Sequence, residues 1–475
     1  MVQPVSKHPT LYELNVRVQL TELGVQLGRR ATLDDFPSAE LDRLAALGFE
    51  WIWLLGVWLT GETGRRISRT LPQLRESYQH LLPGFRDSDV CGSPFAIVSY
   101  TVSEEFGGDS ALARLRGRLR ERGIRLLLDF VPNHTAIDHP WVCEHPEYYV
   151  HGSVKELEDQ PGNYLLIPDA GVFAHGRDPY FPGWIDTLQL NYSNDLLQEA
   201  MRRELMKIAA ICDGVRCDMA MLITPEVFQR TWGTEMHPFW PEAIRGARSV
   251  DSEFVFMAEV YWDMEWNLQQ QGFDYTYDKR LYDRLRNHDV AGMRAHLSAG
   301  LDFQNKLVRF LENHDEERAA SVFSPETYKA AALITYFVPG LRFFHDGQME
   351  GRRKKTSVHL CRRAAEPVDE SLQEFYSQLL SWLSLPVAKN GDWQMLETSA
   401  EACFAFSWGD GQNRAVVLVN YSPDQSQFHA RLANLSGPLA LRDAMSGTVY
   451  QGDAPDLYFD LPGWGYKVLL PRPDV

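Results

Sequence analysis

Short apolar runs recur along this chain, and four of them end in charged or polar side chains. They are residues 124–134 (IRLLLDFVPNH), 213–220 (DGVRCDMA), 254–262 (FVFMAEVYW) and 307–316 (LVRFLENHDE). A continuous apolar run of this length is typical of a strand that is buried on both faces. We therefore predict four buried strands that carry their polar residues at the C-terminal end.

Segments with helical spacing separate the apolar runs. We expect helices at residues 38–47, 71–82, 109–123 and 196–210. Besides the four runs, the last of which gives a strand at 307–315, we expect further strands at residues 11–18, 51–58 and 273–278, and a strand with its loop at residues 340–351. Where strands and helices alternate around a (β/α)8 barrel, the active site gathers at the C-terminal ends of the strands. The polar strand ends are therefore the place to look for chemistry.

The run at residues 213–220 places an arginine beside a carboxylate. Side chains alternate along a strand, so Arg216 and Asp218 share one face, opposite to Val215 and Cys217. The neighbouring cation favours the ionised form of Asp218. A charged carboxylate held at a strand end is what nucleophilic attack on a sugar carbon requires. Taken alone, the motif is equally compatible with an internal Arg–Asp salt bridge.

Taken in order, the four runs carry the motifs DxxxNH, GxRxD, ExxW and NHD. This ordered set resembles the α-amylase family of glycoside hydrolases and transglycosidases, and the resemblance covers most of the chain. It implies an α/β fold: a (β/α)8 TIM barrel with a small insert domain after strand 3 and a C-terminal antiparallel β-domain. Four motifs on four apolar strands are a specific signal, whereas each one alone could be a capped strand end.

The length of 475 residues suits one barrel with additional domains. We place the barrel at residues 1–134 and 186–392. The insert domain is expected at residues 135–185, an irregular stretch rich in Pro, Gly, His and aromatic residues. From residue 393, short strands such as CFAFSW, AVVLVNYS and DLYFDL are separated by turn residues. They predict a C-terminal β-sandwich domain at residues 393–475.

The resemblance also implies the catalytic roles. Asp218 is expected to be the nucleophile. By the same resemblance Glu259 is expected to be the acid/base, and its apolar neighbours in AEVYW should favour the neutral form that this role requires. Asp315 would bind sugar hydroxyls more tightly as the ring flattens in the transition state.

Five further residues are expected to bind or position the substrate. They are His134, Arg216, His314, Phe95 and Trp262. Arg216 would orient Asp218, and the two histidines would donate hydrogen bonds to sugar hydroxyls. Phe95 would stack on the sugar ring, with ordinary core packing as the alternative.

The chain departs from the family pattern at three positions. Ala96 stands where the family often has an aspartate after the aromatic residue, so a contact to a sugar hydroxyl is expected to be missing. Met221 and Leu222 replace the Lys-His pair that many α-amylases carry after the nucleophile, where the carbonyl of the histidine meets calcium. We therefore predict no cofactor and no metal site. Asn133 and a backbone carbonyl keep calcium open as the alternative.

Charge and composition narrow the choice of partners. The formal net charge is −17 and the isoelectric point is near 5.3. This argues against nucleic acid and membranes as partners and suits a neutral α-glucoside or oligosaccharide. The six cysteines show no CxxC pair and no zinc-like spacing. No apolar run reaches about 18 residues and the N-terminus lacks a signal-peptide core, so we expect a cytoplasmic location.

Together these features predict an enzyme: a retaining α-glycosidase that cleaves α-glucosidic bonds of short oligosaccharides or small glucosides through a covalent glycosyl-enzyme. Long loops at residues 60–108 and 135–185 should wall the site into a pocket. Two alternatives stay open. One is a transglycosidase or phosphorylase of the same family, and the other is a non-catalytic carbohydrate-binding relative. The basic run at residues 352–363 is expected to be solvated surface; otherwise it would suit an anionic substrate.

Overall fold

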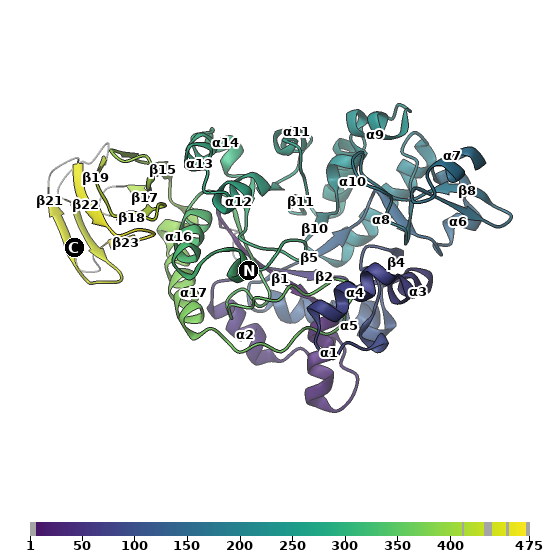
Figure 1. The fold of residues 1–475 in the computed structure, drawn as a ribbon, viewed down its shortest axis with the longest axis horizontal. Coiled ribbons are helices and arrows are strands. Elements are labelled where there is room, and N and C mark those ends of the chain that lie inside the picture. The colour runs from purple at the N-terminus through teal and green to yellow at the C-terminus, as the bar shows by residue number, and fades with distance from the viewer. Residues whose placement is uncertain (1–5, 411–412, 432–438, 453–455, 472–475) are drawn as a thin grey trace.

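The computed structural model describes residues 6–410, 413–431, 439–452 and 456–471. Its centre is a closed barrel of eight parallel strands (Figure 1). In the order in which they neighbour one another, the strands are β1 (Thr10–Asn15), β14 (Leu341–His345), β13 (Leu307–Arg309), β12 (Tyr275–Tyr277), β11 (Val255–Ala258), β10 (Gly214–Cys217), β5 (Arg125–Phe130) and β2 (Trp51–Leu55). Nearly all of their residues are buried, which explains the continuous apolar runs in the sequence. The predicted barrel is confirmed.

Helices surround the barrel and follow its strands along the chain. They are α1 (Val16–Leu27), α2 (Ser38–Ala46), α5 (Gly108–Arg120), α8 (Asp195–Ile211), α9 (Pro225–Trp232), α10 (Trp240–Val250), α11 (Glu265–Gln270), α12 (Lys279–Arg286), α13 (Val290–Leu297), α14 (Leu301–Gln304), α15 (Ala319–Val322), α16 (Pro325–Tyr336), α17 (Glu370–Leu383) and α18 (Pro386–Asn390). In α8, the buried residues Leu197, Met201, Leu205 and Ile208 recur at helical spacing, and the side chain of Asn194 caps the first turn. This spacing made the helix visible in the sequence.

The strands are shorter than the apolar runs suggested, and three of them show why. The first ends at Asn15, because its side chain accepts a hydrogen bond from the backbone N–H of Val18 and starts α1. The second stops before Gly56, whose φ of 81° turns the chain. The seventh ends at Arg309, and the residues that follow form the loop that carries Asp315.

The long segment between β2 and β5 contains more regular structure than expected. It holds α3 (Glu62–Thr70), α4 (Pro72–Leu81) and an antiparallel pair formed by β3 (Trp58–Thr60) and β4 (Ile97–Val102). Among these elements, the sequence had predicted the helix α4. The segment therefore forms a region of regular secondary structure beside the barrel.

The insert after β5 contains two small antiparallel strand pairs and two short helices. Its elements are β6 (His134–Ala136), α6 (Trp141–Glu144), α7 (Val154–Asp159), β7 (Tyr164–Ile167), β8 (Gly171–Ala174) and β9 (Thr187–Gln189). Strands β6 and β9 pair, with His134 opposite Gln189, so the two ends of the insert meet beside the C-terminal end of β5. The limits of the insert at residues 135–185, and those of the other two domains, stay a prediction.

The C-terminal region forms two antiparallel sheets, at the end of the molecule opposite to the insert (Figure 1). The larger sheet has the order β15 (Trp393–Met395), β17 (Cys403–Asp410), β18 (Asn413–Asn420), β23 (Tyr466–Pro471), β20 (Leu439–Asp443) and β21 (Val449–Gly452). The smaller sheet has the order β16 (Glu397–Thr398), β19 (Ser426–Arg431) and β22 (Asp456–Leu461). Leu418 and Leu469 of the larger sheet share one core cluster with Phe428 and Phe459 of the smaller. The predicted antiparallel β-domain is therefore confirmed, although residues 472–475 lie outside the described part.

Two further findings concern membrane-spanning helices and the cysteines. Within the described residues, no helix is both long and apolar enough to cross a membrane. The six cysteines are free thiols.

Candidate active site

The backbone holds two of the predicted catalytic residues at one edge of the barrel. Asp218 directly follows β10, and Glu259 directly follows its parallel neighbour β11. The ladder of hydrogen bonds continues through both residues: the N–H of Asp218 donates to Phe130 O (2.9 Å), and the N–H of Glu259 donates to Cys217 O (3.0 Å). Both carboxylates therefore sit at the C-terminal ends of the strands, where barrel enzymes carry their chemistry.

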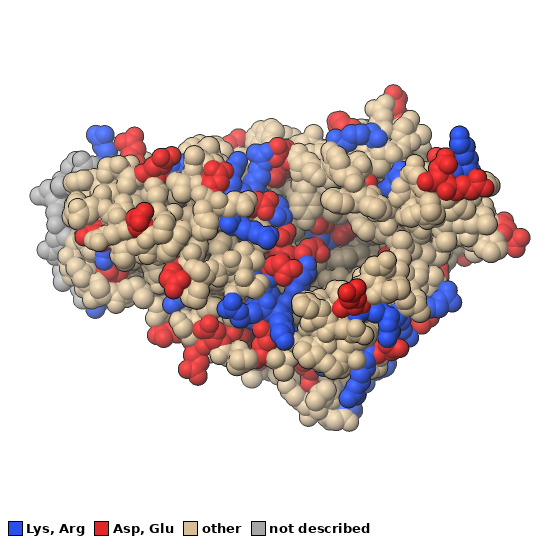
Figure 2. Space-filling model, viewed as in Figure 1, with Lys and Arg blue, Asp and Glu red and all other residues tan. Residues whose placement is uncertain are grey.

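A cavity of about 320 Å³ opens at this edge. Its lining comes from several separate segments: Ser93, Phe95, His134, Trp184, Asp186, Thr187, Asp218, Met219, Glu259, Tyr261, Asp315, Val358 and His359. The structure thus brings Asp218, Glu259 and Asp315 together, and adds His134 and Phe95 of the predicted binding residues. In Figure 2 a hollow with acidic side chains is visible in the middle of the face shown, with basic side chains along one of its sides.

Arg216 bridges two of these carboxylates from inside the barrel. Its Nη1 lies 2.7 Å from Oδ1 of Asp218, and its Nη2 lies 2.6 Å from Oε2 of Glu259. The guanidinium also faces the rings of Trp53 and Phe95, each 5.2 Å away. Burial disfavours its charge, but the acidic groups around it, Glu259 foremost, raise the pKa of Arg216 well above its usual value. The Arg–Asp pair is thus a buried salt bridge whose carboxylate also faces a cavity.

Burial raises the pKa of both carboxylates. The pKa of Glu259 rises to about 7, because desolvation and the negative charges of Asp218 and Asp315 outweigh the attraction of Arg216. Desolvation likewise raises the pKa of Asp218 against the opposing effect of Arg216. From the sequence we expected only that Arg216 would lower the pKa of Asp218. The desolvation that raises this pKa arises from the closed barrel, which the local sequence does not show.

The surroundings of Glu259 are polar, in contrast to the apolar environment that the sequence suggested. Oε2 accepts hydrogen bonds from Arg216 and from the backbone N–H of Met219 (2.8 Å), and Oε1 accepts one from the Tyr261 hydroxyl (2.8 Å). Met219 has a φ of 42°, a left-handed conformation that is uncommon for residues other than glycine. The turn directly after Asp218 therefore points a backbone donor at Glu259.

Asp315 is paired with His314. Oδ2 of Asp315 lies 2.8 Å from Nε2 of His314, and the Asp315 side chain is 43% exposed. Desolvation opposes ionisation of Asp315, but the charge and contact of His314 lower its pKa below the usual value. His314 itself does not line the cavity and contacts the carboxylate of Asp315, so its direct contact with sugar hydroxyls stays a prediction.

The remaining predicted binding residues differ in their placement. His134 lines the cavity, and burial lowers the pKa of its ring to about 3, so the ring is neutral. Trp262 does not line the cavity; it packs against Tyr180, with ring centroids 5.0 Å apart. It lines an adjoining hollow of about 410 Å³ that shares Met219 and Tyr261 with the cavity. Trp262 therefore lies outside the cavity and its role in substrate binding stays a prediction, while its neighbour Tyr261 lines the cavity.

Sequence reasoning missed several residues of the site. Glu13 lies inside the strand TLYELN, followed by Leu14 and Asn15, so it lacks the polar strand end that marked the other four runs. Tyr261 lies inside the run FVFMAEVYW at residues 254–262, next to the predicted Trp262. Val358 and His359 come from the loop after β14, and nothing in that loop marks them as cavity residues.

The residues present do not fit a calcium ion at the position that the family resemblance suggested. The side-chain amides of Asn133 and Gln189 bind each other: Asn133 Nδ2 donates to Gln189 Oε1 (3.2 Å), and Gln189 Nε2 donates to Asn133 Oδ1 (3.0 Å). Calcium prefers roughly six to eight oxygen ligands. Across the described residues, no group of three or more His, Cys, Asp or Glu side chains is placed to hold a metal.

A larger hollow lies elsewhere in the described part of the molecule. It measures about 860 Å³ and lies beside α1 and the β3–β4 pair, with Arg17, Trp58 and Glu62 in its lining. It contains none of the predicted catalytic carboxylates. The chemistry therefore points to the smaller cavity as the active site.

A closed barrel that brings three carboxylates and an arginine together at the C-terminal ends of its strands is the arrangement of a barrel enzyme that acts on glycosidic bonds. A family model described as "Alpha amylase, catalytic domain" matches residues 39–380. The chain therefore belongs to the α-amylase family. Its curated relatives are named as α-amylases, maltosyltransferases and trehalose synthases.

Curated relatives include hydrolases and transferring enzymes. The α-amylase MalA of Haloarcula japonica is 23% identical over 429 residues, which cover 87% of this chain and 55% of the relative. The trehalose synthase/amylase TreS of Mycobacterium tuberculosis is 28% identical over 282 residues, 54% of this chain and 39% of the relative. The chain thus spans about half the length, or less, of these relatives.

Solved structures share the fold over their full length. The maltogenic α-amylase AmyB of Thermotoga neapolitana superposes with a TM-score of 0.71 at 18% identity and covers 98% of this chain and 99% of that one. The α-amylase of Geobacillus thermoleovorans, solved in complex with acarbose, gives a TM-score of 0.71 at 17% identity and covers 100% of both chains.

Proposed function

We propose that this protein is a retaining α-glycosidase that acts on short α-glucosides or oligosaccharides through a glycosyl-enzyme formed on Asp218. The observation that carries the proposal is the pair Asp218 and Glu259, which are bridged by the two terminal nitrogens of one guanidinium and line the same cavity. Retaining enzymes hold their two carboxyl groups about 5–5.5 Å apart, closer than inverting enzymes do. Two carboxylates on one guanidinium suit the shorter separation.

The proposed steps use each residue in one role. Ionised Asp218 attacks the anomeric carbon, and protonated Glu259 gives its proton to the leaving oxygen. Glu259 then removes a proton from the water or hydroxyl that releases the sugar from Asp218. A pKa of about 7 supports this exchange, because both protonation states of Glu259 are then accessible near neutral pH. Asp315 stays ionised and accepts hydrogen bonds from the sugar.

The shape of the cavity supports short substrates. Trp184 and Asp186 line it on the side of the insert, and Val358 and His359 line it from the loop after β14. Together with the adjoining hollow, its volume lies in the range of sites that bury most of a small ligand, roughly 300–1000 Å³. Such a site admits one chain end with few further sugars. The structural relative AmyB is itself described as maltogenic.

The charges around the site support a neutral substrate over an anionic one. Four carboxylates line the cavity: Asp186, Asp218, Glu259 and Asp315. Three side chains of the basic run at residues 352–363 have partners: Arg362 pairs with Asp89, Arg363 pairs with Glu22 and Asp346, and the Lys355 ammonium donates to the backbone oxygen of Asp315. This favours water or a sugar hydroxyl over phosphate as the acceptor.

Transfer to a second sugar is the alternative outcome of the same chemistry. The adjoining hollow, which contains Trp262, meets the cavity at Met219 and Tyr261 and has room for an acceptor. Hydrolysis and transfer differ only in which hydroxyl attacks the glycosyl-enzyme, so the carboxylates alone do not separate them.

One experiment tests the proposal. The protein is incubated with maltose, maltotriose, isomaltose, trehalose and sucrose, with and without phosphate, and the first products are observed by proton NMR. We expect release of the α-anomer from at least one of these glucosides, and no dependence on phosphate. First release of the β-anomer would exclude a retaining mechanism, and new oligosaccharides would identify a transglycosidase.

A further inference from the structure

Asp186 lines the catalytic cavity, yet the structure provides no partner for its buried oxygen. The residue lies just before β9, where the insert rejoins the barrel, and it is 8% exposed. No hydrogen-bond partner is found for Oδ2 among the described residues. Its neighbours on one side are apolar or backbone: a methyl group placed on Gly64 would lie 3.4 Å from the Asp186 Cβ and 3.5 Å from the Ala96 Cβ.

The other carboxylates of the cavity are all satisfied by cations of the protein. Asp218 and Glu259 share Arg216, and Asp315 faces His314. A buried carboxylate without a donor costs free energy, because it has lost its hydration and gained nothing in return. A ligand in the cavity that brings a donor to Asp186 would recover this loss.

The chemistry of the cavity indicates which donor is required. With three further carboxylates in the lining, the site repels anions, and a neutral donor that carries no charge of its own fits best. Sugar hydroxyls are such donors. The neighbouring residues His134 and Trp184, whose rings lie 5.1 Å apart, supply a neutral polar group and an aromatic surface on the same side.

We propose that Asp186 is a specificity-determining residue that accepts a hydrogen bond from one hydroxyl of the sugar bound in the cavity. The proposal rests on the proposed function, since it assumes that a sugar occupies this site.

A double-difference measurement tests this assignment. The kcat/KM values of the wild type and of Asp186→Ala are measured on an aryl α-glucoside and on each of its monodeoxy analogues. For the wild type, we expect one analogue to lose roughly 10- to 100-fold in kcat/KM, the effect of a hydrogen bond to a charged group. In Asp186→Ala that penalty should shrink to near unity, while the parent glucoside loses a similar factor.

Two further variants provide a conservative substitution and a control. Asp186→Asn keeps the shape of the side chain, serves if the alanine variant does not fold, and should reduce the same single penalty. Asp138→Ala is the matched control, because Asp138 is an exposed carboxylate of the insert whose Oδ2 accepts from Thr63 N (3.0 Å) outside the cavity. Its pattern of penalties should equal that of the wild type.

The outcomes distinguish the role of Asp186 from the proposed glycosidase function. Equal penalties for every analogue in the wild type and both Asp186 variants would overturn the role of Asp186 while leaving the glycosidase activity in place. Failure of the wild type to act on any α-glucoside would overturn the proposed function and this inference with it.

Discussion

Nδ1 of His314 lies 2.5 Å from Oε1 of Glu13, although the two residues are 301 positions apart in the sequence. Glu13 stands near the end of β1 and is fully buried. Because the other nitrogen of His314 faces Asp315, the imidazole is held between two carboxylates. Burial disfavours a charged ring, but Asp315 and Glu13 together raise the pKa of His314 well above its usual value. Glu13 thus acts on the cavity through His314.

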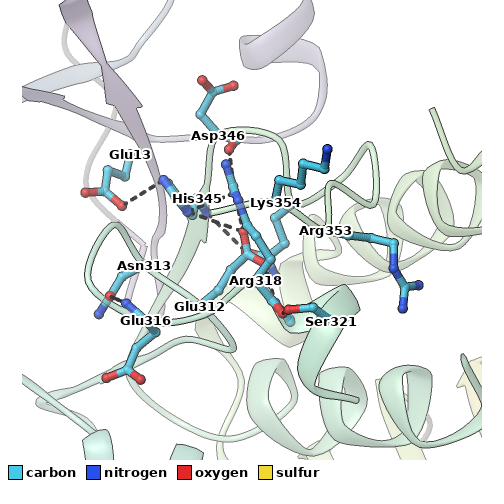
Figure 3. Close-up of polar contacts among 12 residues, drawn as sticks. Glu13, Glu312, Asn313, Glu316, Arg318, Ser321, His345, Asp346, Arg353 and Lys354 are labelled. Atoms are coloured by element: carbon cyan, nitrogen blue, oxygen red, sulfur yellow. Dashed lines mark hydrogen bonds and ion pairs between the residues drawn. The ribbon is translucent and has the colours of Figure 1, made fainter. Parts of the chain in front are cut away.

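The carboxylate of Glu13 belongs to a larger buried network, drawn in Figure 3. Oε2 of Glu13 lies 3.8 Å from Nε2 of His345, and Nδ1 of His345 lies 3.3 Å from Oε1 of Glu312. Glu312 in turn accepts a hydrogen bond from Arg318 (2.5 Å). Buried charges therefore join the C-terminal end of β1 to those of β13 and β14 behind Asp315.

The first prediction concerns Glu13→Gln. Removing the negative charge beside Nδ1 should lower the pKa of His314, so that its ring titrates nearer to the usual range. NMR of nitrogen-labelled histidine follows this titration directly, and kcat/KM should fall by roughly 10- to 100-fold as Asp315 loses its fixed cation. Glu312→Gln is the control, because it changes the same network without touching His314. A His314 ring that stays protonated well above neutral pH in Glu13→Gln would contradict this role.

The second prediction concerns Asp218→Asn. Loss of the nucleophile should lower turnover by several powers of ten, while the amide keeps the size of the side chain and Arg216 keeps Glu259 as its partner. The control is Asp213→Asn, because Asp213 forms a buried 2.7 Å ion pair with Arg116 just before the same strand begins. We expect that variant to lose stability in thermal unfolding and to keep most of its activity. Near-normal turnover of Asp218→Asn would remove Asp218 from the mechanism.

The third prediction concerns the pH dependence of the reaction. Glu259 donates a proton in the first step, so the rate should fall as pH rises through its pKa of about 7. The hydrogen bond from Tyr261 favours the ionised form of Glu259, so Tyr261→Phe should move this alkaline limb to higher pH.

A companion variant isolates the acid step itself. Glu259→Gln should still be glycosylated by substrates with good leaving groups and should then stall, because no base remains to activate water. Mass spectrometry would detect the accumulated glycosyl-enzyme. Turnover of such substrates at the wild-type rate would show that Glu259 is not the acid/base.

The fourth prediction concerns metal ions. Because the amides of Asn133 and Gln189 satisfy each other, we expect neither activity nor the melting temperature to change after treatment with a calcium chelator. Both are measured before and after chelation, and again after calcium is added back. Activity that is lost with chelator and restored by calcium would prove this expectation wrong.

The fifth prediction concerns substrate size. The walls at Trp184 and His359 should make kcat/KM higher on a maltose-sized substrate than on soluble starch. Trp184→Ala, which opens the wall on the side of the insert, should reduce this preference. A rapid fall in the viscosity of starch, the sign of internal cleavage, would contradict a closed pocket.

The sequence by itself determined the barrel and the position of the carboxylates along it. Strands buried on both faces must be apolar throughout, so Asp218 and Glu259 stand out at their ends. The helices were visible for a similar local reason, because one face of each must be apolar to cover the barrel. The limits of the strands were less predictable, since the cap at Asn15 and the turn at Gly56 cut apolar runs that the pattern alone would have continued.

Only the tertiary structure decided which side chains share the cavity. His314 meets Glu13, and Asp186 meets the cavity without a partner, because the closure of the barrel and the return of the insert bring distant segments together. Tyr261 rather than Trp262 reaches Glu259, a difference of one position that depends on the turn after β11. The pKa values of Glu259 and Asp218 depend on burial and on charges from other strands. Such properties arise from contacts between residues far apart in the chain, which local sequence patterns do not record.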